Sequence, residues 1–189
     1  MSLASAMKYH GMTLDRWMDS TGKVHHGARP TAAAMPLASH TFHAGEEATD
    51  DTKQPKWWLE EDAMTREREQ MRMWCPQFTE FPGNDEQPPM WHGTINTGMT
   101  TFSVAIVHRV DHGLPFIVPI GEGTRLRKST PHRYVNGNLC VASAEDWDPT
   151  EHTAAIAVGW AAHWFSCYID WLFSGCKTWP LESHVQQAA

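Results

Sequence analysis

The sequence predicts an α/β fold of the α+β type, in which a four-stranded antiparallel meander is flanked by an N-terminal helix and a long C-terminal helix. Two patterns predict this fold. Between residues 77 and 120, short segments of alternating apolar side chains are separated by turn residues, as in consecutive antiparallel strands. On either side of them, apolar residues recur at steps of three and four, which is a helical period. A chain of 189 residues suits one such domain with extensions.

The first helix is expected over residues 57–74. Its apolar positions are separated by Glu and Arg, and they are Trp57, Ala63, Met64, Met71 and Trp74. Such spacing places apolar side chains along one side of a helix. Pro76 ends the segment because proline cannot continue a helix.

Four strands are expected next, over residues 77–81, 91–96, 101–108 and 116–120. The connections between them contain Gly, Pro, Asn and Asp, which are turn residues. In the third strand, alternation places Phe102, Val104 and Ile106 on one face. That face is therefore expected to pack on a helix.

The long C-terminal helix is expected over residues 148–175. Asp148 suits the N-cap, Pro149 the first helical position, and Glu151 a capping box. Gly175 suits the position just beyond the helix end. One face of this helix is expected to cover the sheet, and its members are Ile156, Trp160, Trp164, Tyr168, Trp171 and Leu172.

A membrane span is not expected from this apolar segment. His163 and Asp170 interrupt it, and a charged side chain is costly at the centre of a bilayer. The first residues also lack the basic start and sustained apolar run of a secretory signal. We therefore expect a protein of the cytoplasm with no membrane partner.

Residues 1–55 are expected to form a partly flexible N-terminal arm, followed by the folded domain over residues 56–185. The arm has little periodicity, except for one short hairpin in which residues 20–23 turn between two extended segments. Residues 45–51 have the acidic composition of a linker. The His and Trp content of the arm suggests a surface that docks on a partner, and its composition equally permits a flexible tail.

Composition excludes several classes of function. A formal net charge of −7 gives no basic surface for a phosphate backbone, so we expect no nucleic-acid partner. Four cysteines without a C-x-x-C pair predict neither a disulfide framework nor a cysteine-rich zinc site, and they fit a reducing cytosol. The histidines cluster in the arm (His25, His26, His40 and His43) but match no strong zinc pattern, so no metal or other cofactor is expected.

Cys140 is the candidate nucleophile. It follows the turn sequence Asn136-Gly137-Asn138, which is expected to keep the chain near Cys140 at the surface. The other cysteines are expected to be inert, because Cys167 and Cys176 lie in or at the end of an aromatic helix and Cys75 precedes a proline.

The segment around Cys140 resembles the active-site region of the ubiquitin-conjugating enzymes. That family places His-Pro-Asn upstream of Gly-x-(Ile/Leu)-Cys, and Trp-x-Pro and a helix after it. Gly137-Asn138-Leu139-Cys140 and Trp147-Asp148-Pro149 match the later two motifs. The first motif differs from the family pattern. Thr130-Pro131-His132 stands in place of His-Pro-Asn, so His132 takes the position of the family's Asn.

The Pro-His pair resembles the prokaryotic members of this superfamily, which are encoded beside ubiquitin-like proteins and activating enzymes in bacterial defence operons. The end of the chain is also similar to that branch, through Trp164, Tyr168, Trp171, Gly175, Trp179, Pro180 and His184. Residues 91–184, about half of the chain, take part in the resemblance.

The resemblance implies a UBC-like fold and a conjugating enzyme. Such an enzyme accepts a ubiquitin-like modifier from an activating enzyme as a thioester on Cys140 and transfers it to an acceptor lysine. A thiol suits both steps, because it ionises near neutral pH and is a good leaving group. His132 is the second candidate catalytic residue, either as a donor to the thioester oxygen or as a structural histidine. Asn136 is likewise either a donor or a turn former.

Two alternatives remain open at this point. Some members of the superfamily keep the fold without activity and only bind a ubiquitin-like protein or a partner. A thiol hydrolase using Cys140 and His132 is less well supported, because no oxyanion-hole motif is visible. Glu145 and Asp146 either orient the incoming lysine or are solvated loop charges.

Overall fold

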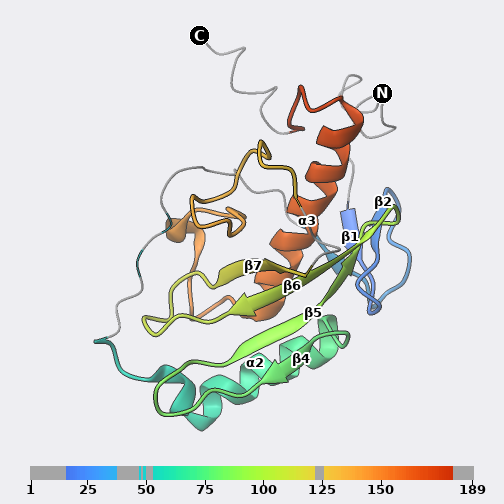
Figure 1. Ribbon diagram of the computed structural model, residues 1–189. Coiled ribbons are helices and arrows are strands. Elements are labelled where there is room, and N and C mark those ends of the chain that lie inside the picture. Colours follow the sequence, from blue (N-terminus) through green and yellow to red (C-terminus); the bar gives the residue numbers. More distant parts are fainter. Residues whose placement is uncertain (1–15, 38–46, 48, 50–52, 122–125, 181–189) are drawn as a thin grey trace.

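The computed structural model describes residues 16–37, 47, 49, 53–121 and 126–180. It is a mixed α/β structure, as predicted, with two α-helices, a four-stranded antiparallel sheet and a second sheet of three short strands (Figure 1). The elements in chain order are β1 Arg16–Met18, β2 Val24–His26, β3 Met35–Pro36, η1 Trp57–Leu59, α2 Glu61–Trp74, β4 Thr79–Phe81, β5 Met90–Asn96, β6 Thr101–Val107, β7 Phe116–Ile120, η3 Ala144–Asp146 and α3 Ala154–Phe173.

The large sheet has the predicted meander order, β4-β5-β6-β7, with every neighbouring pair antiparallel. Its first strand is shorter than expected because the N–H of Phe78 donates to the carbonyl of Cys75, which keeps residues 77 and 78 in the turn after α2. The alternation in β6 is confirmed, since Phe102, Val104 and Ile106 are all buried.

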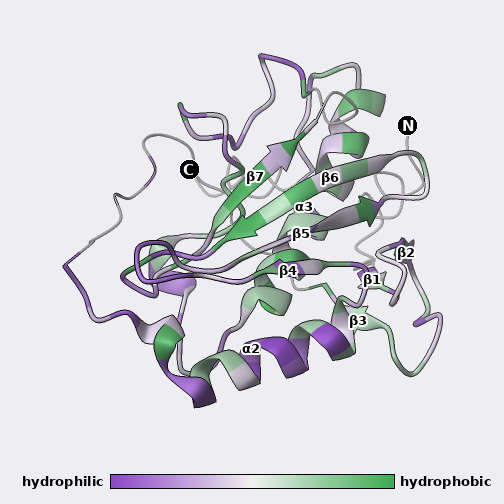
Figure 2. Ribbon diagram, turned by 60° about the horizontal axis from the view of Figure 1, so that its bottom comes forward, coloured by the Kyte–Doolittle hydropathy of each residue, from purple (hydrophilic) through white to green (hydrophobic). Residues whose placement is uncertain are grey.

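Helix α3 covers one face of this sheet, and α2 lies along the β4 and β5 side (Figure 1). Phe102 of β6 stacks on Phe165 of α3 with ring centroids 4.3 Å apart, and it meets Tyr168 edge-on. Sixteen of the 20 residues of α3 are buried, whereas the outer side of α2 is hydrophilic (Figure 2). The central element of the fold is therefore α3.

The start of α3 differs from the prediction. Asp148 instead stabilises a turn, because its carboxylate accepts hydrogen bonds from the N–H and hydroxyl of Thr150. The helix begins six residues later, at Ala154, whose N–H donates to the carboxylate of Glu67 on α2 at 2.9 Å. The cap thus comes from another helix, which the local sequence does not reveal.

The end of α3 follows the prediction. Gly175 has a φ of +73°, and its N–H donates to the carbonyl of Leu172. The N–H of Cys176 donates to the carbonyl of Trp171. These two bonds form a Schellman motif, which needs the left-handed backbone that glycine adopts without strain.

The hairpin predicted in the arm is confirmed. Strands β1 and β2 pair antiparallel, and β3 adds to the other edge of β1. The described part of the arm packs on the domain, because its apolar side chains join the same hydrophobic cluster as α3; they are Met18, Val24, Met35 and Leu37. Arg16 also contacts α3, with 2.9 Å between its Nη1 and Nδ1 of His163 and an ion pair to Asp170.

The division into an arm of residues 1–55 and a domain of residues 56–185 stays a prediction. Most of the acidic run 45–51, together with His40, His43 and His184, lies outside the described residues. In the described part of the chain, no helix is long and apolar enough to cross a membrane.

The buried acid that caps α3 gives a testable pH dependence. Burial raises the pKa of Glu67 from 4.5 to about 7. Because the folded protein holds this proton more tightly than the unfolded chain, the stabilisation it gives is full below about pH 4.5 and is lost as the pH rises to about 7. The shift corresponds to about 3 kcal/mol.

We expect Glu67→Gln to remove this dependence, because an uncharged amide oxygen still accepts from Ala154. Relative to the variant, the wild-type free energy of unfolding should fall by about 3 kcal/mol between pH 4.5 and pH 8 in urea titrations. The wild type has to be compared with the variant because burial lowers the pKa of the neighbouring His108. That shift makes the free energy of unfolding rise with pH, opposite to the effect of Glu67. Glu69→Gln, at an exposed position of α2, is the control, and parallel profiles for wild type and Glu67→Gln contradict the assignment.

Candidate active site

Cys140 lies in the long loop between β7 and α3, as predicted. Its position is fixed by the main chain on both sides. The N–H of Leu139 donates to the carbonyl of Ile117 in β7 at 2.9 Å, and the N–H of Cys140 donates to the carbonyl of His132 at 3.1 Å. The loop is therefore hydrogen-bonded to the edge strand β7 directly before the thiol.

A tight hairpin precedes Cys140, in agreement with the turn prediction. Arg133 and Leu139 form an antiparallel bridge, and the N–H of Gly137 donates to the carbonyl of Tyr134. Gly137 has a φ of +95°, and a Cβ there would lie 2.9 Å from the guanidinium of Arg133. Arg133 in turn donates to the carbonyl of Gly137. Glycine is thus favoured by the left-handed backbone, whereas the flexible end of the Arg133 side chain could move away from a Cβ.

The prediction that Cys140 lies near the surface is wrong. Its side chain is 0% exposed, although Val135 at the tip of the hairpin is 87% exposed. The turn residues do face solvent, but the chain passes inward directly after them, and Leu139, Val141 and Ala142 join the hydrophobic core. Exposure of the turn therefore does not extend to the cysteine.

Tyr134, which the sequence analysis did not single out, is the polar neighbour of the thiol. Burial raises the pKa of the Tyr134 phenol, and a hydrogen bond with the side chain of Cys140 raises it further. The environment of Cys75 is different from that of Cys140. Burial alone raises the pKa of the Cys75 thiol. The pairing of the hairpin could have pointed to Tyr134 as a neighbour of the thiol. Residues 133 and 139 pair, so residue 134 lies across from residue 138, which is close to Cys140 in the chain.

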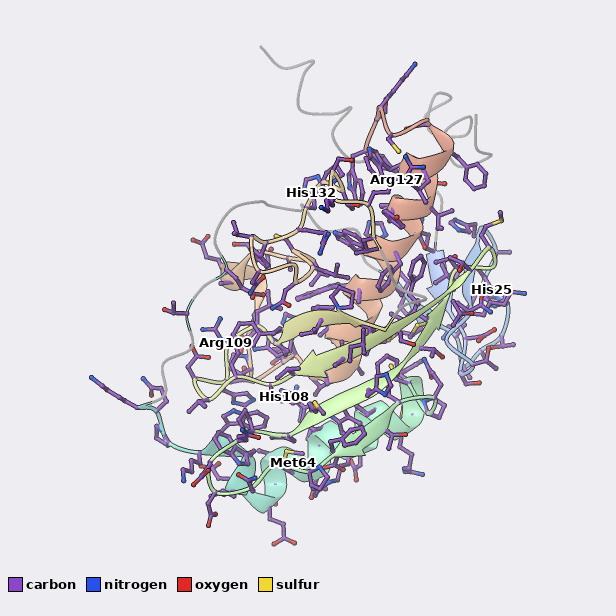
Figure 3. All side chains as sticks on the ribbon, in the orientation of Figure 1. His25, Met64, His108, Arg109, Arg127 and His132 are labelled. Carbon is purple, nitrogen blue, oxygen red and sulfur yellow. The ribbon has the colours of Figure 1, made fainter. Side chains whose placement is uncertain are left out.

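His132 organises the loop through its main chain. Its φ of +54° is in the left-handed region, and its carbonyl accepts from both the N–H of Cys140 and, at 2.9 Å, the indole N–H of Trp164 on α3. The His132 ring lies beside that of Trp179, with centroids 5.1 Å apart. Figure 3 places His132 on the loop alongside α3. One backbone oxygen thus links the cysteine to the central helix.

The remaining polar residues of the motif region have local roles. Asn136 is a turn former, because its side-chain oxygen accepts from the N–H of Asn138. Asp146 accepts from the N–H of Ser143 in a capping box around η3, and Glu145 is exposed.

Trp147 of the Trp-x-Pro motif joins the loop to the β6–β7 connection. Its indole N–H donates to the carbonyl of His112.

One residue of the arm, Glu47, contacts the hairpin before Cys140, and a second, Thr49, contacts the chain that follows β6. Oε2 of Glu47 accepts hydrogen bonds from the side-chain amides of Asn136 and Asn138, each at 2.7 Å. The carbonyl of Thr49 accepts from Arg109 at 2.7 Å. In the sequence these residues belong to an apparent acidic linker, so composition gave no sign of the contact.

No group of three or more His, Cys, Asp and Glu side chains within the described ranges is arranged to hold a metal ion. His25, one of the arm histidines, instead pairs with Asp19 at 2.6 Å. None of the four cysteines, all of which are described, forms a disulfide.

Comparison with known proteins identifies the family. No curated protein and no solved structure gives a significant match. Residues 67–186, well over half of the chain, match the family described as Type II CBASS E2 protein, and this span includes the whole loop that carries Cys140. The chain therefore belongs to the Type II CBASS E2 family, the prokaryotic UBC-like E2 proteins of antiviral defence operons, whose general setting is ubiquitin-like conjugation.

Proposed function

We propose that this protein accepts a ubiquitin-like modifier from an activating enzyme as a thioester on Cys140 and transfers it to the amine of an acceptor lysine. The observation that supports this most is the polar environment of one cysteine. Cys140 hydrogen-bonds with the Tyr134 hydroxyl, and its own N–H is held by His132. The phenol gives this sulfur a hydrogen-bond donor, which a thiol surrounded only by apolar side chains lacks.

Each step of the proposed reaction exchanges one bond to the modifier's acyl carbon. In the first step, the Cys140 thiolate attacks the thioester carbon on the activating enzyme, a new C–S bond forms, and the departing thiolate takes up a proton. In the second step, the lysine amine attacks the same carbon, a C–N bond forms, and the Cys140 thiolate leaves while the amine loses a proton to solvent. The Tyr134 hydroxyl is placed to stabilise the sulfur when it is charged.

His132 is proposed to act in the second step. Negative charge grows on the thioester oxygen as the amine attacks, and a fixed donor lowers that barrier. The His132 main chain is held in place by two hydrogen bonds to its carbonyl, so its ring starts from a fixed point close to Cys140. The cytoplasm is the proposed location, because a thiol of this kind has to remain reduced.

The alternative is an inactive UBC-fold module that only binds a ubiquitin-like protein or a partner. The burial of Cys140 favours it, because a thiol that is 0% exposed cannot react with another protein without a change of structure. A charging assay separates the two functions.

Cys140→Ala is expected to abolish a reductant-sensitive adduct when the protein is incubated with activating enzyme, ATP and modifier and read on a non-reducing gel. Cys140→Ser is expected either to give a more stable oxyester or not to charge, because a hydroxyl ionises far less than a thiol. Ser replacements of Cys75, Cys167 and Cys176 are the controls and should leave charging intact. An adduct that persists in Cys140→Ala places the nucleophile elsewhere.

His132→Ala is expected to form the thioester at near-normal levels but to discharge it to free lysine about ten to a thousand times more slowly, which is the effect of losing one preorganised donor. His132→Asn should recover part of the rate, because an amide N–H replaces the ring donor and Asn tolerates the left-handed backbone at this position. Single-turnover discharge of preloaded protein measures both. Discharge of His132→Ala at the wild-type rate limits His132 to its structural role.

A further inference from the structure

The chain that follows α3 turns back toward the loop between β7 and α3. Gly175 takes the left-handed backbone that ends the helix. The hydroxyl of Ser174 then accepts hydrogen bonds from the N–H groups of Lys177 and Thr178, at 3.2 and 3.1 Å. Figure 1 shows the chain running back along α3 after the helix ends. This turn carries Trp179 into the core beside that loop.

Trp179 packs on the central helix and on the active-site loop at the same time. It is 1% exposed, and its ring centroid lies 5.4 Å from that of Trp164 and 6.3 Å from that of Trp171, both on α3. The same ring lies 5.1 Å from the imidazole of His132, at an interplanar angle of 52°. Aromatic rings at these distances attract one another beyond the effect of the area they bury. Trp179 therefore joins the His132 ring to the most rigid part of the fold.

Two tryptophans in mutual contact hold His132 at two places. The indole N–H of Trp164 holds the main chain through the carbonyl of His132, whereas Trp179 lies against the ring. The backbone of His132 has a φ of +54°, a conformation that residues other than glycine keep only where the surrounding structure enforces it. The main chain and the ring of His132 thus have separate supports, and both come from outside the motif that precedes Cys140.

We propose that Trp179 is a positioning residue, which holds the His132 ring in the orientation from which it donates to the thioester oxygen. It acts through His132 and is not itself a catalytic residue. A donor lowers the barrier only while it points at the oxygen that becomes charged. Fixing the ring therefore raises the rate of transfer to the amine and leaves pick-up of the modifier unchanged. The role given to Trp179 rests on the proposed function only through the task of the His132 ring.

Single-turnover discharge of preloaded protein to free lysine measures the effect. Trp179→Leu should charge normally but discharge about two- to tenfold more slowly, which corresponds to the loss of one aromatic pair. Trp179→Phe keeps a ring at this position and should slow discharge less. Trp91→Leu removes a buried indole from β5 and is the matched control, which should discharge at the wild-type rate. Equal slowing in Trp179→Leu and Trp91→Leu overturns the proposal, because general damage to the core then explains both.

A double-mutant cycle separates positioning from a structural role. In the His132→Ala background no ring remains to be oriented, so adding Trp179→Leu should slow discharge no further. If Trp179→Leu does not fold, Trp179→Phe takes its place in the cycle. Slowing by the same factor in both backgrounds contradicts the proposal. Discharge of His132→Ala at the wild-type rate also overturns it, and leaves the conjugating function standing.

Carbon-13 relaxation of the His132 ring tests the contact without activating enzyme or modifier. The order of the ring should fall in Trp179→Leu and stay at the wild-type value in Trp91→Leu. Reduced order in Trp179→Leu, without any thioester in the charging assay, supports the role of Trp179 in fixing His132 and overturns the conjugating function. Normal charging with unchanged ring order in Trp179→Leu supports the conjugating function and overturns the role of Trp179.

Discussion

The rest of the structure depends on one constraint: helix α3 is apolar on nearly all sides and has to be buried. A surface helix shows one apolar stripe, but α3 carries aromatic and small residues around its whole circumference, so every side of it requires a cover. The meander supplies one, through the stacking of Phe102 on Phe165. The sheet β2-β1-β3 supplies another, and Trp179 packs from the chain that follows the helix. Helix α2 contacts the start of α3 through Glu67, and the loop that carries Cys140 contacts α3 through the bond from Trp164 to the carbonyl of His132.

The contact of this loop with α3 determines where the thiol of Cys140 lies. The indole of Trp164 is buried and has to find an acceptor, and it donates to the carbonyl of His132. The same carbonyl accepts from the N–H of Cys140. The requirement for a hydrogen bond inside the core and the position of the candidate nucleophile are therefore met by one oxygen atom, and the left-handed backbone of His132 directs it.

Burying such a helix also requires polar groups in unusual places. The first N–H of α3 is inside the protein, and it is satisfied by the carboxylate of Glu67, whose pKa rises because of burial. Along the helix, Asp170 pairs with Arg16 from β1. Buried charges of this kind persist only with a partner, which explains why the described part of the arm is attached so closely to the domain.

The sequence by itself determined the elements whose causes are local. Alternation in β6, the turn at Asn136-Gly137 and the position of Gly175 just beyond the end of α3 depend on residues a few positions apart, and each was predicted correctly. The resemblance carried by the segment around Cys140 pointed to the family that the match over residues 67–186 establishes. Only the tertiary structure decided that α3 begins at Ala154, that Cys140 is buried beside Tyr134, and that Glu47 reaches the hairpin. These features depend on contacts between distant parts of the chain, and no spacing within one segment encodes which distant side chain supplies the missing hydrogen bond.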